Sequence, residues 1–271
     1  MKYFRINIYL KIKHYFFSFF LKEKNLKKKL ENSLKINSKK KYFISTSQLR
    51  VAFLILLKYL KIKYPKKNEI IFLSFNLAEM INISKNLNYK IKFCDLNYDN
   101  GFFKIKDFIK KINKNTVAAV LTNMFNSYED TILIKNICRE KKIILIEDNA
   151  ISFDNYKIIK NRRIYTGSFG LYSLYSFNIM KNISALYGGG VATNDIDFTN
   201  FAVKEIDKYS NFPNFLLIKQ SINFLLLKIL SVNFFYKIFF FKIVKYAYFK
   251  NNQFLLKIFY PSLKFRHKKF P

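Results

Sequence analysis

Between residues 47 and 148 the sequence alternates short apolar runs with longer stretches of helical character, and this alternation constrains the fold most. The runs are rich in Ile, Val, Leu and Phe and have the length of buried strands, whereas the stretches between them repeat apolar residues at helical spacing. We predict strands over 69–75, 90–96, 117–122 and 143–148, and helices over 47–60, 76–88, 103–113 and 129–142. This order favours an α/β fold, in which a largely parallel sheet carries helices on both faces.

The same pattern divides the 271-residue chain into three parts. Residues 1–41 form a basic lead-in with room for one helix. Residues 42–200 form the main domain, which gains two further strands over 170–177 and 189–195. Residues 201–271 are basic, aromatic and helical or irregular, with no clear strand.

The charge of the chain is strongly positive, at +32 from 49 basic and 17 acidic residues. Residues 51–200 are the most balanced part, and the two flanks supply most of the excess. Such a charge favours contact with anionic surfaces, either lipid or nucleic acid. Of the basic residues 43 are Lys, and no nucleic-acid recognition motif occurs, so we do not expect a nucleic acid partner.

The apolar C-terminal part is interrupted by lysines, and no uncharged stretch approaches the roughly 18–20 residues of a spanning helix. Two interpretations stay open: helices that lie in a membrane interface with snorkelling lysines, or a helical layer packed against the chain itself or a partner subunit. The apolar run 15–21 is short for a signal peptide and has no cleavage site after it. With only Cys94 and Cys138, a reduced, cytoplasmic setting fits best, and a peripheral place at the inner membrane is a further expectation.

The ends of the predicted strands carry the residues with the most chemistry, because parallel sheets bind ligands at the carboxyl ends of their strands. Asp148 ends one strand, Ser176 lies near the end of another, and Lys181 follows it. A lysine in apolar surroundings acts as an amine nucleophile when its pKa is lowered. The plainer alternatives are a helix-capping Asp, a surface Lys and, for Gly188–Gly190, an ordinary turn. No phosphate-loop motif or Cys/His cluster for a metal is present.

Taken together, residues 143–195 carry four motifs in a fixed order: E-D-x-A, G-S-F-G, S-F-x-x-x-K-N, and a glycine-rich turn that leads into V-x-T-N-D. They correspond to Glu147–Ala150, Gly167–Gly170, Ser176–Asn182 and Gly188–Asp195. This set, with Asp148 and Lys181 at the required spacing, resembles the DegT/DnrJ/StrS family of pyridoxal phosphate (PLP)-dependent sugar aminotransferases, within the aspartate aminotransferase superfamily of fold type I. The resemblance covers about residues 42–200. It implies a three-layer αβα large domain with a mostly parallel mixed sheet.

The resemblance also implies roles for individual residues. Lys181 would hold PLP covalently and shuttle a proton, and Asp148 would pair with the pyridine nitrogen. Ser176 would bind the phosphate, and Ala150 belongs to the same cofactor-binding segment. Upstream, Leu49 and Arg50 stand where the family has Gly-Thr at the start of its first helix. Backbone N–H groups there would face the phosphate, and Arg50 would add a bidentate contact. Two more segments fall at family positions: Leu77, where many members have an aromatic residue over the cofactor ring, and Asn123–Phe125.

The function implied is amino transfer to a nucleotide-linked keto sugar, with glutamate as donor, in surface glycan or lipopolysaccharide biosynthesis. A homodimer is implied as well. The family's dehydratases typically replace the cofactor-binding lysine, which this chain retains as Lys181.

Three departures bear on this expectation. Ile151 stands where Gln or His is common, and Tyr187 replaces an acidic residue. The chain ends at Pro271, whereas family members continue into a C-terminal domain that closes the site. We therefore expect that domain to be missing or reduced to helices, and little transaminase activity from the chain as written. The alternative function is a catalytically degenerate or truncated member that serves as a binding or scaffold subunit.

Overall fold

The computed structural model describes residues 13, 25–99, 101–123, 128–153, 156–159, 161–178, 181, 183, 185, 187–209, 214–230, 232, 238, 241–252 and 254–255. The chain divides into two compact units. One is Lys22–Phe212, and the other combines Met1–Leu21 with Pro213–Pro271. The larger unit therefore extends beyond residues 42–200 at both ends.

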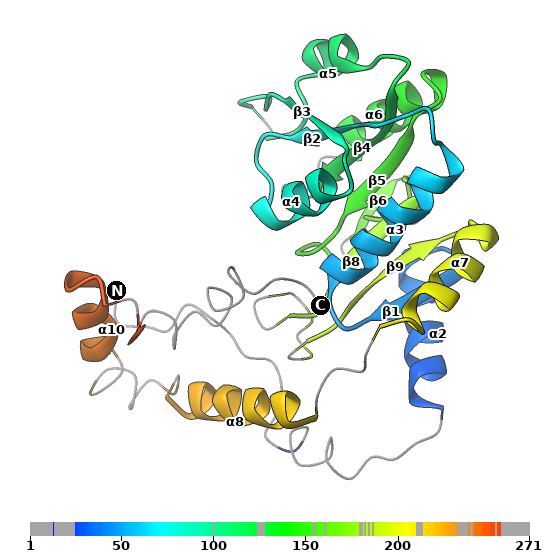
Figure 1. Cartoon of the computed structure of the whole chain (residues 1–271). Coiled ribbons are helices and arrows are strands. Elements are labelled where there is room, and N and C mark those ends of the chain that lie inside the picture. Colours follow the sequence, from blue (N-terminus) through cyan, green and yellow to red (C-terminus); the bar gives the residue numbers. More distant parts are fainter. Residues whose placement is uncertain are drawn as a thin grey trace. The chain divides into compact units, whose positions relative to one another are not determined.

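A seven-stranded sheet forms the centre of the larger unit, in the order β1-β9-β8-β5-β4-β2-β3 (Figure 1). Its strands are β1 (Tyr42–Thr46), β2 (Glu69–Leu73), β3 (Lys90–Cys94), β4 (Thr116–Thr122), β5 (Ile144–Asp148), β8 (Tyr172–Ser176) and β9 (Gly189–Thr193). All neighbouring pairs are parallel except those of β9, which runs antiparallel to both β8 and β1. The predicted α/β fold with a mostly parallel mixed sheet is confirmed.

Helices cover both faces of this sheet. Successive side chains of a strand point to opposite faces, so the continuous apolar runs place apolar side chains on both faces, and each face needs a cover. On one face Ile70 and Phe72 of β2 join the core beneath α3 (Leu49–Lys63), α4 (Ala78–Asn86) and α7 (Ile196–Ile206). On the other face Ile71 and Leu73 join the core beneath α5 (Ile105–Lys111) and α6 (Tyr128–Glu140). Strands buried on both sides explain why the apolar runs of the sequence are continuous rather than alternating.

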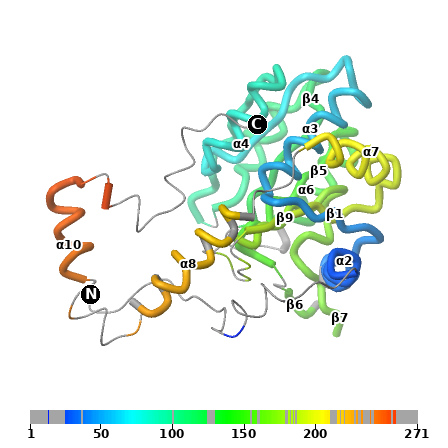
Figure 2. The backbone as a smooth tube through the Cα atoms, turned by 60° about the horizontal axis from the view of Figure 1, so that its bottom comes forward, coloured from blue at the N-terminus to red at the C-terminus, as the bar shows by residue number. Residues whose placement is uncertain are grey.

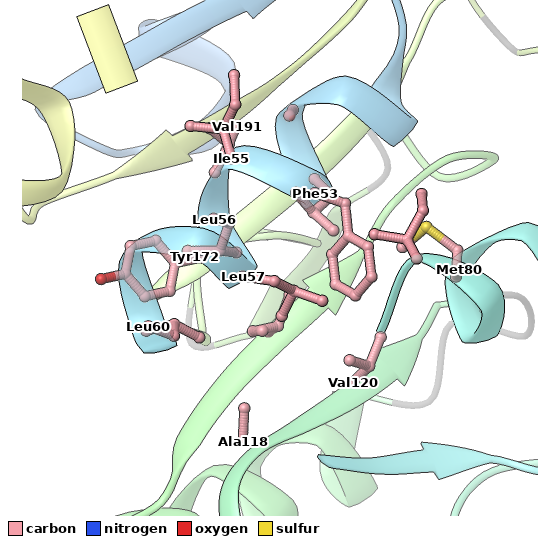
Figure 3. Close-up of a cluster of buried hydrophobic side chains, with 14 of the residues drawn as sticks. Phe53, Ile55, Leu56, Leu57, Leu60, Met80, Ala118, Val120, Tyr172 and Val191 are labelled. Carbon is pink, nitrogen blue, oxygen red and sulfur yellow. The ribbon is translucent and has the colours of Figure 1, made fainter. Parts of the chain in front are cut away.

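Helix α3 contributes most to the larger core. Figure 3 shows Phe53 and Leu57 of this helix on the side that faces the sheet residues Ala118 and Val120, with Met80 of α4 beside Phe53 and Leu56 beside Tyr172 of β8. These residues are almost completely buried. Since burial of one large apolar side chain stabilises a fold by roughly 1.5–3 kcal/mol, α3 is firmly fixed on the sheet.

One strand and a separate hairpin were not predicted, whereas the lead-in contains the one helix for which it has room. Strand β1 lies at the edge of the sheet, and α2 (Leu26–Ser38) precedes it within the basic lead-in. A separate hairpin, β6 (Tyr156–Ile159) with β7 (Arg162–Tyr165), was not predicted, because its basic, exposed strands lack an apolar pattern. Figure 2 shows it on the side of the unit that carries α2, where Lys39 Nζ lies 5.4 Å from the Tyr165 ring centroid.

The second unit contains the helices α8 (Asn214–Leu230) and α10 (Phe241–Phe249). No strand occurs among its described residues. Across the described part of the chain, no helix combines the length and apolar character needed to cross a membrane.

Candidate active site at the carboxyl edge of the sheet

Asp148 and Ser176 lie on the same face of the sheet, at the carboxyl ends of adjacent strands. Ile146 of β5 and Leu174 of β8 belong to the core beneath α3, and Asp148 and Ser176 follow them by two residues. Because side chains alternate along a strand, both polar groups project toward the α3 side. The structure thus brings two predicted site residues together at one edge.

The carboxylate of Asp148 is deeply buried, with 3% of the residue exposed. The Ala150 N–H donates a hydrogen bond to Oδ1 at 3.0 Å, so Ala150 contributes through its backbone. Burial raises the pKa of Asp148, and both this hydrogen bond and the charge of Lys181 oppose the rise. Such a carboxylate strongly favours a cationic partner.

Lys181 lies in the segment after β8, where its backbone N–H donates to the Asn178 carbonyl at 3.0 Å. Burial lowers the pKa of its ammonium group, and the charge of Asp148 raises it. The two groups are therefore close enough to interact electrostatically, although they are far apart in sequence. A lysine of lowered pKa keeps more of its amine neutral and nucleophilic near neutral pH.

The N-terminal end of α3 adjoins Ser176 through the glycine turn. Ser176 pairs with Gly189, and Gly189 pairs on its other side with Thr46, just before α3. A Cβ atom at Gly189 would overlap the backbone nitrogen of Leu49, so only glycine lets β9 approach the helix start this closely. The helix has no acidic residue in its first turn, and the Gln48 side chain does not cap it. Its positive end therefore suits an anion beside the Ser176 hydroxyl.

Arg50 lies at this helix end beside the glycine turn. Its Nε and Nη2 both donate to Gln48 Oε1, at 2.9 and 2.6 Å. Burial raises the pKa of Tyr187, and the charge of Arg50 lowers it, so the two side chains interact. The predicted bidentate contact of Arg50 with a phosphate stays a prediction.

Glu147, next to Asp148, has a different role that the sequence did not reveal. Its buried carboxylate accepts hydrogen bonds from the backbone N–H groups of Gly167, Phe169 and Gly170, at 3.0, 2.9 and 2.6 Å. Lys40 Nζ donates to the carbonyl of the same Gly170 at 2.6 Å. The G-S-F-G segment before β8 is therefore held from two sides, which fixes the start of the strand that leads to Ser176 and Lys181.

A second polar cluster supports the neighbouring strand ends; Asn123 was singled out from the sequence, but its contacts were not. Asn123 Nδ2 donates to Glu147 Oε1 at 3.2 Å and to Asn149 Oδ1 at 2.7 Å. Asn76 Nδ2 donates to Thr122 Oγ1 at 2.9 Å. The sequence signal for the Asn123 and Asn76 contacts is the same: an asparagine or threonine at the end of a parallel strand or shortly after it.

Other predicted positions are less closely tied to this site. Leu77 is the N-cap residue of α4 and has an exposed side chain, and Ile151 is exposed as well. The remaining positions singled out from the sequence, 124–125, 179–180 and 182, lie outside the described residues. Within the described part of the chain, no group of three or more His, Cys, Asp or Glu residues could hold a metal ion.

The model of the DegT/DnrJ/EryC1/StrS aminotransferase family matches residues 14–205. The chain belongs to this family. The match includes every element that forms the carboxyl edge, so the predicted DegT-family membership is confirmed. Pyridoxal phosphate is the cofactor of this family.

Relatives of known name support the assignment. The chain is 26% identical over 171 residues to GDP-perosamine synthase of Escherichia coli O157:H7, covering 63% of this chain and 45% of the synthase. A solved structure of Helicobacter pylori PseC, an aminotransferase involved in the biosynthesis of pseudoaminic acid, superposes with a TM-score of 0.65 at 20% identity, covering 75% of this chain and 55% of PseC. A solved structure of an E. coli GDP-4-keto-6-deoxy-D-mannose-3-dehydratase with bound hydrated PLP superposes with a TM-score of 0.62 at 19% identity. The superposition covers 74% of this chain and 54% of the dehydratase.

The DegT-family chain thus spans about half the length of the relatives it matches. Likeness at these structural identities shows the fold. The residues at the carboxyl edge fit the family's cofactor, since a buried carboxylate, a lysine of lowered pKa and an uncapped helix end next to a serine hydroxyl lie at one edge.

Proposed function

We propose that the chain is a PLP-dependent aminotransferase of nucleotide-linked keto sugars, with glutamate as amino donor, in cytoplasmic steps of surface glycan or lipopolysaccharide biosynthesis. The electrostatic pairing of Lys181 with Asp148 at the carboxyl edge is the observation that carries this proposal. The sugar class is supported by the names of the relatives, GDP-perosamine synthase and PseC.

Each residue has a distinct task in this proposal. Bound PLP supplies an electron sink for the negative charge that develops at the amino carbon. Lys181 attaches the cofactor through its amine and then moves the proton at that carbon. Asp148 keeps the ring nitrogen protonated, because a buried carboxylate strongly favours a nearby positive charge. Ser176 and the N-terminal end of α3 bind the phosphate.

Lys181 also favours amino transfer over dehydration. The structural neighbours include both aminotransferases and a GDP-4-keto-6-deoxy-D-mannose-3-dehydratase, so the fold alone does not separate the two reactions. The family's dehydratases typically replace the lysine that holds the cofactor. This chain has a lysine at position 181, which favours the aminotransferase reaction.

We further propose that the larger unit forms a homodimer. Phe75 and Leu77 follow β2 at the carboxyl edge, and both side chains are more than half exposed. Apolar side chains beside a polar site suit cover by a second subunit. Light scattering on the folded protein tests this point, and a stable monomer would contradict it.

The cofactor is the first test of the function. The purified chain incubated with PLP should show an absorbance band near the edge of the visible range. Borohydride reduction followed by peptide mapping should place the label on Lys181. Lys181→Ala should lose both signals, and Lys204→Ala, at an exposed position of α7, should retain them. A label on another lysine would overturn the site, and no cofactor binding would favour the degenerate, scaffold-type subunit.

The two half-reactions test the substrates separately. Glutamate alone should discharge the absorbance band, and a nucleotide-linked 4-keto sugar added afterwards should restore it. The absorbance change of each half-reaction requires only one turnover, so it can be measured even in a slow enzyme. A band that glutamate leaves unchanged would contradict the amino donor, and one that no keto sugar restores would contradict the acceptor class.

A further inference from the structure

The second unit of the chain has an unusual charge composition. Residues 1–21 carry 4 basic side chains and residues 213–271 carry 11, and neither stretch contains an Asp or Glu. All 17 acidic residues of the protein therefore belong to the larger unit. The second unit therefore carries an excess of positive side-chain charge, which attracts anionic surfaces.

Helix α8 of this unit presents a row of exposed apolar side chains, which we call the α8 stripe. Its members are Phe215, Ile218, Ile222, Leu226 and Ile229. They follow one another at intervals of three or four residues, which places them on one side of the helix. Phe224, on the opposite side, is almost completely buried. The stripe is therefore the outward face of α8.

Helix α10 repeats the combination of exposed apolar and basic residues. Ile243, Tyr246 and Phe249 are exposed, and so are Lys242 and Lys245. Lys245 Nζ lies 5.7 Å from the Phe249 ring centroid. Aromatic rings and lysines in alternation are typical of helices at the boundary between lipid headgroups and acyl chains.

Two observations separate a lipid surface from other partners. The described helices are too short or too charged to span a bilayer, so they would lie on it rather than cross it. A nucleic acid would match the charge but not the α8 stripe, since aliphatic side chains do not pair with phosphates.

We propose that the unit formed by residues 1–21 and 213–271 attaches the protein to anionic membranes, with the α8 stripe inserted among the lipids and the lysines directed to the headgroups. This attachment is independent of the proposed enzymatic function. It adds a membrane surface as a partner of the chain.

The absence of tryptophan from the chain permits a direct test. A single tryptophan introduced as Ile222→Trp reports on the stripe, and Ile62→Trp, on an exposed position of α3 in the larger unit, is the matched control. Residue 222 is 52% exposed and residue 62 is 68% exposed. With phosphatidylglycerol vesicles, the emission of Ile222→Trp should shift to shorter wavelength and that of Ile62→Trp should not. Equal shifts, or no shift at residue 222, would overturn the proposal.

Co-sedimentation of the full-length chain with vesicles gives the second readout. We expect binding to phosphatidylglycerol vesicles, weak binding to pure phosphatidylcholine, and a loss of binding at high salt. Ile222→Glu should lower the partition coefficient by about tenfold or more, because it places a charge among the lipids. Ile62→Glu makes the same chemical change in the larger unit and should have little effect.

Three outcomes would contradict the proposal. Equal loss in both glutamate variants would indicate attraction by net charge alone. A dimer in lipid-free solution that Ile222→Glu dissociates would assign the stripe to a second copy of the chain. Binding to a nucleic acid in preference to vesicles, reduced by Ile222→Glu, would assign it to that partner.

Discussion

Burial acts in opposite directions on the two charged groups at the carboxyl edge. It raises the pKa of Asp148 and lowers that of Lys181, so burial favours the neutral form of each. Their mutual attraction opposes both shifts. The reactivity of the lysine amine therefore depends on the carboxylate, and a change at residue 148 has a predictable sign at residue 181.

The pH dependence of labelling tests this coupling. Half-maximal reaction of Lys181 with an amine-reactive probe should occur below the ordinary lysine pKa of 10.5, since a lowered pKa leaves more neutral amine at any given pH. Asp148→Asn removes the attraction that raises the Lys181 pKa, so the labelling curve should move to still lower pH. Mass spectrometry of labelled peptides measures both curves, and a move to higher pH would contradict the coupling.

Glu147 shows that a residue beside the site is needed for its geometry. Glu147→Gln keeps the size of the side chain but replaces one acceptor oxygen with an NH2 donor. The N–H groups of Phe169 and Gly170 both donate to Oε2, so they compete for fewer acceptors. We expect a loss of roughly 2–4 kcal/mol in unfolding free energy. Urea denaturation measures it, with Glu140→Gln at an exposed site of α6 as the control that should change little.

Sequence reasoning found the residues of a motif but not the residues that support it. Asp148, Ser176 and Lys181 were predicted because motif order and spacing identify them together. Lys40 was not, since it is one of 43 lysines and its partners are backbone carbonyls more than a hundred residues away. No local pattern marks such a contact.

At the scale of elements, the start of α3 is positioned by β9 rather than by its own capping residue. Gly189→Ala should displace Leu49 and weaken the anion site, lowering the affinity for PLP by about tenfold or more. Gly190→Ala is the matched control, because its Cβ atom meets the Phe43 ring and the Ile44 carbonyl instead. Both variants should be destabilised, but only Gly189→Ala should lose affinity in a titration of the folded protein. Equal losses of affinity would contradict this role of β9.

Helix α7 begins at a capping residue with several partners. Asp195 accepts hydrogen bonds from the Phe198 N–H at 3.0 Å and from the Tyr172 hydroxyl at 2.6 Å. Asp195→Ala should therefore cost about 2–4 kcal/mol, through the lost cap and an unsatisfied tyrosine. Asp197→Ala, an exposed neighbour in the first turn, is the control and should cost much less.

The pH dependence of this stabilisation has a definite sign. Burial raises the pKa of Asp195, but hydrogen bonds from Tyr172, Phe198 and Tyr59 outweigh it and leave the pKa below its ordinary value of 3.8. The stabilisation is then fully present above pH 3.8 and is lost as the pH falls through the lower, folded-state pKa. Thermal unfolding should show the wild type and Asp195→Ala converging only in that acid range.

The helices and strands of the α/β pattern were predicted well because each is buried on at least one face and carries a periodic signal. Strand β1 was missed, because it stands before the first predicted helix, outside the alternation that identified β2 to β5, and directly follows three lysines at 39–41. The hairpin of β6 and β7 was missed for another reason. It pairs only with itself, and residues 156–158 and 162–163 are exposed, so burial imposes no regular apolar pattern on it.

On the scale of the whole molecule, the two units differ in composition as well as in fold. The larger unit holds the sheet, most of the family match and all Asp and Glu residues, whereas the charged side chains of the second unit are all basic. The sequence indicated this division through its uneven charge, but it left lipid and protein partners open. The exposed apolar side of α8 is what favours a lipid partner over a protein partner. The sequence alone could not show it, because side-chain exposure depends on how the helix packs.

The place of β9 has a consequence for how the protein is made. This strand comes last along the sheet-forming part of the chain, yet it lies between β8 and β1, and β1 pairs with no other strand. During synthesis β1 leaves the ribosome early and must wait, unpaired and partly apolar, until residues 189–193 emerge. In that interval the unpaired edge of β1 can associate with the edges of other chains. Since the same strand positions the start of α3, the phosphate end of the site forms only when translation has passed it, and cofactor capture belongs to the last stage of folding.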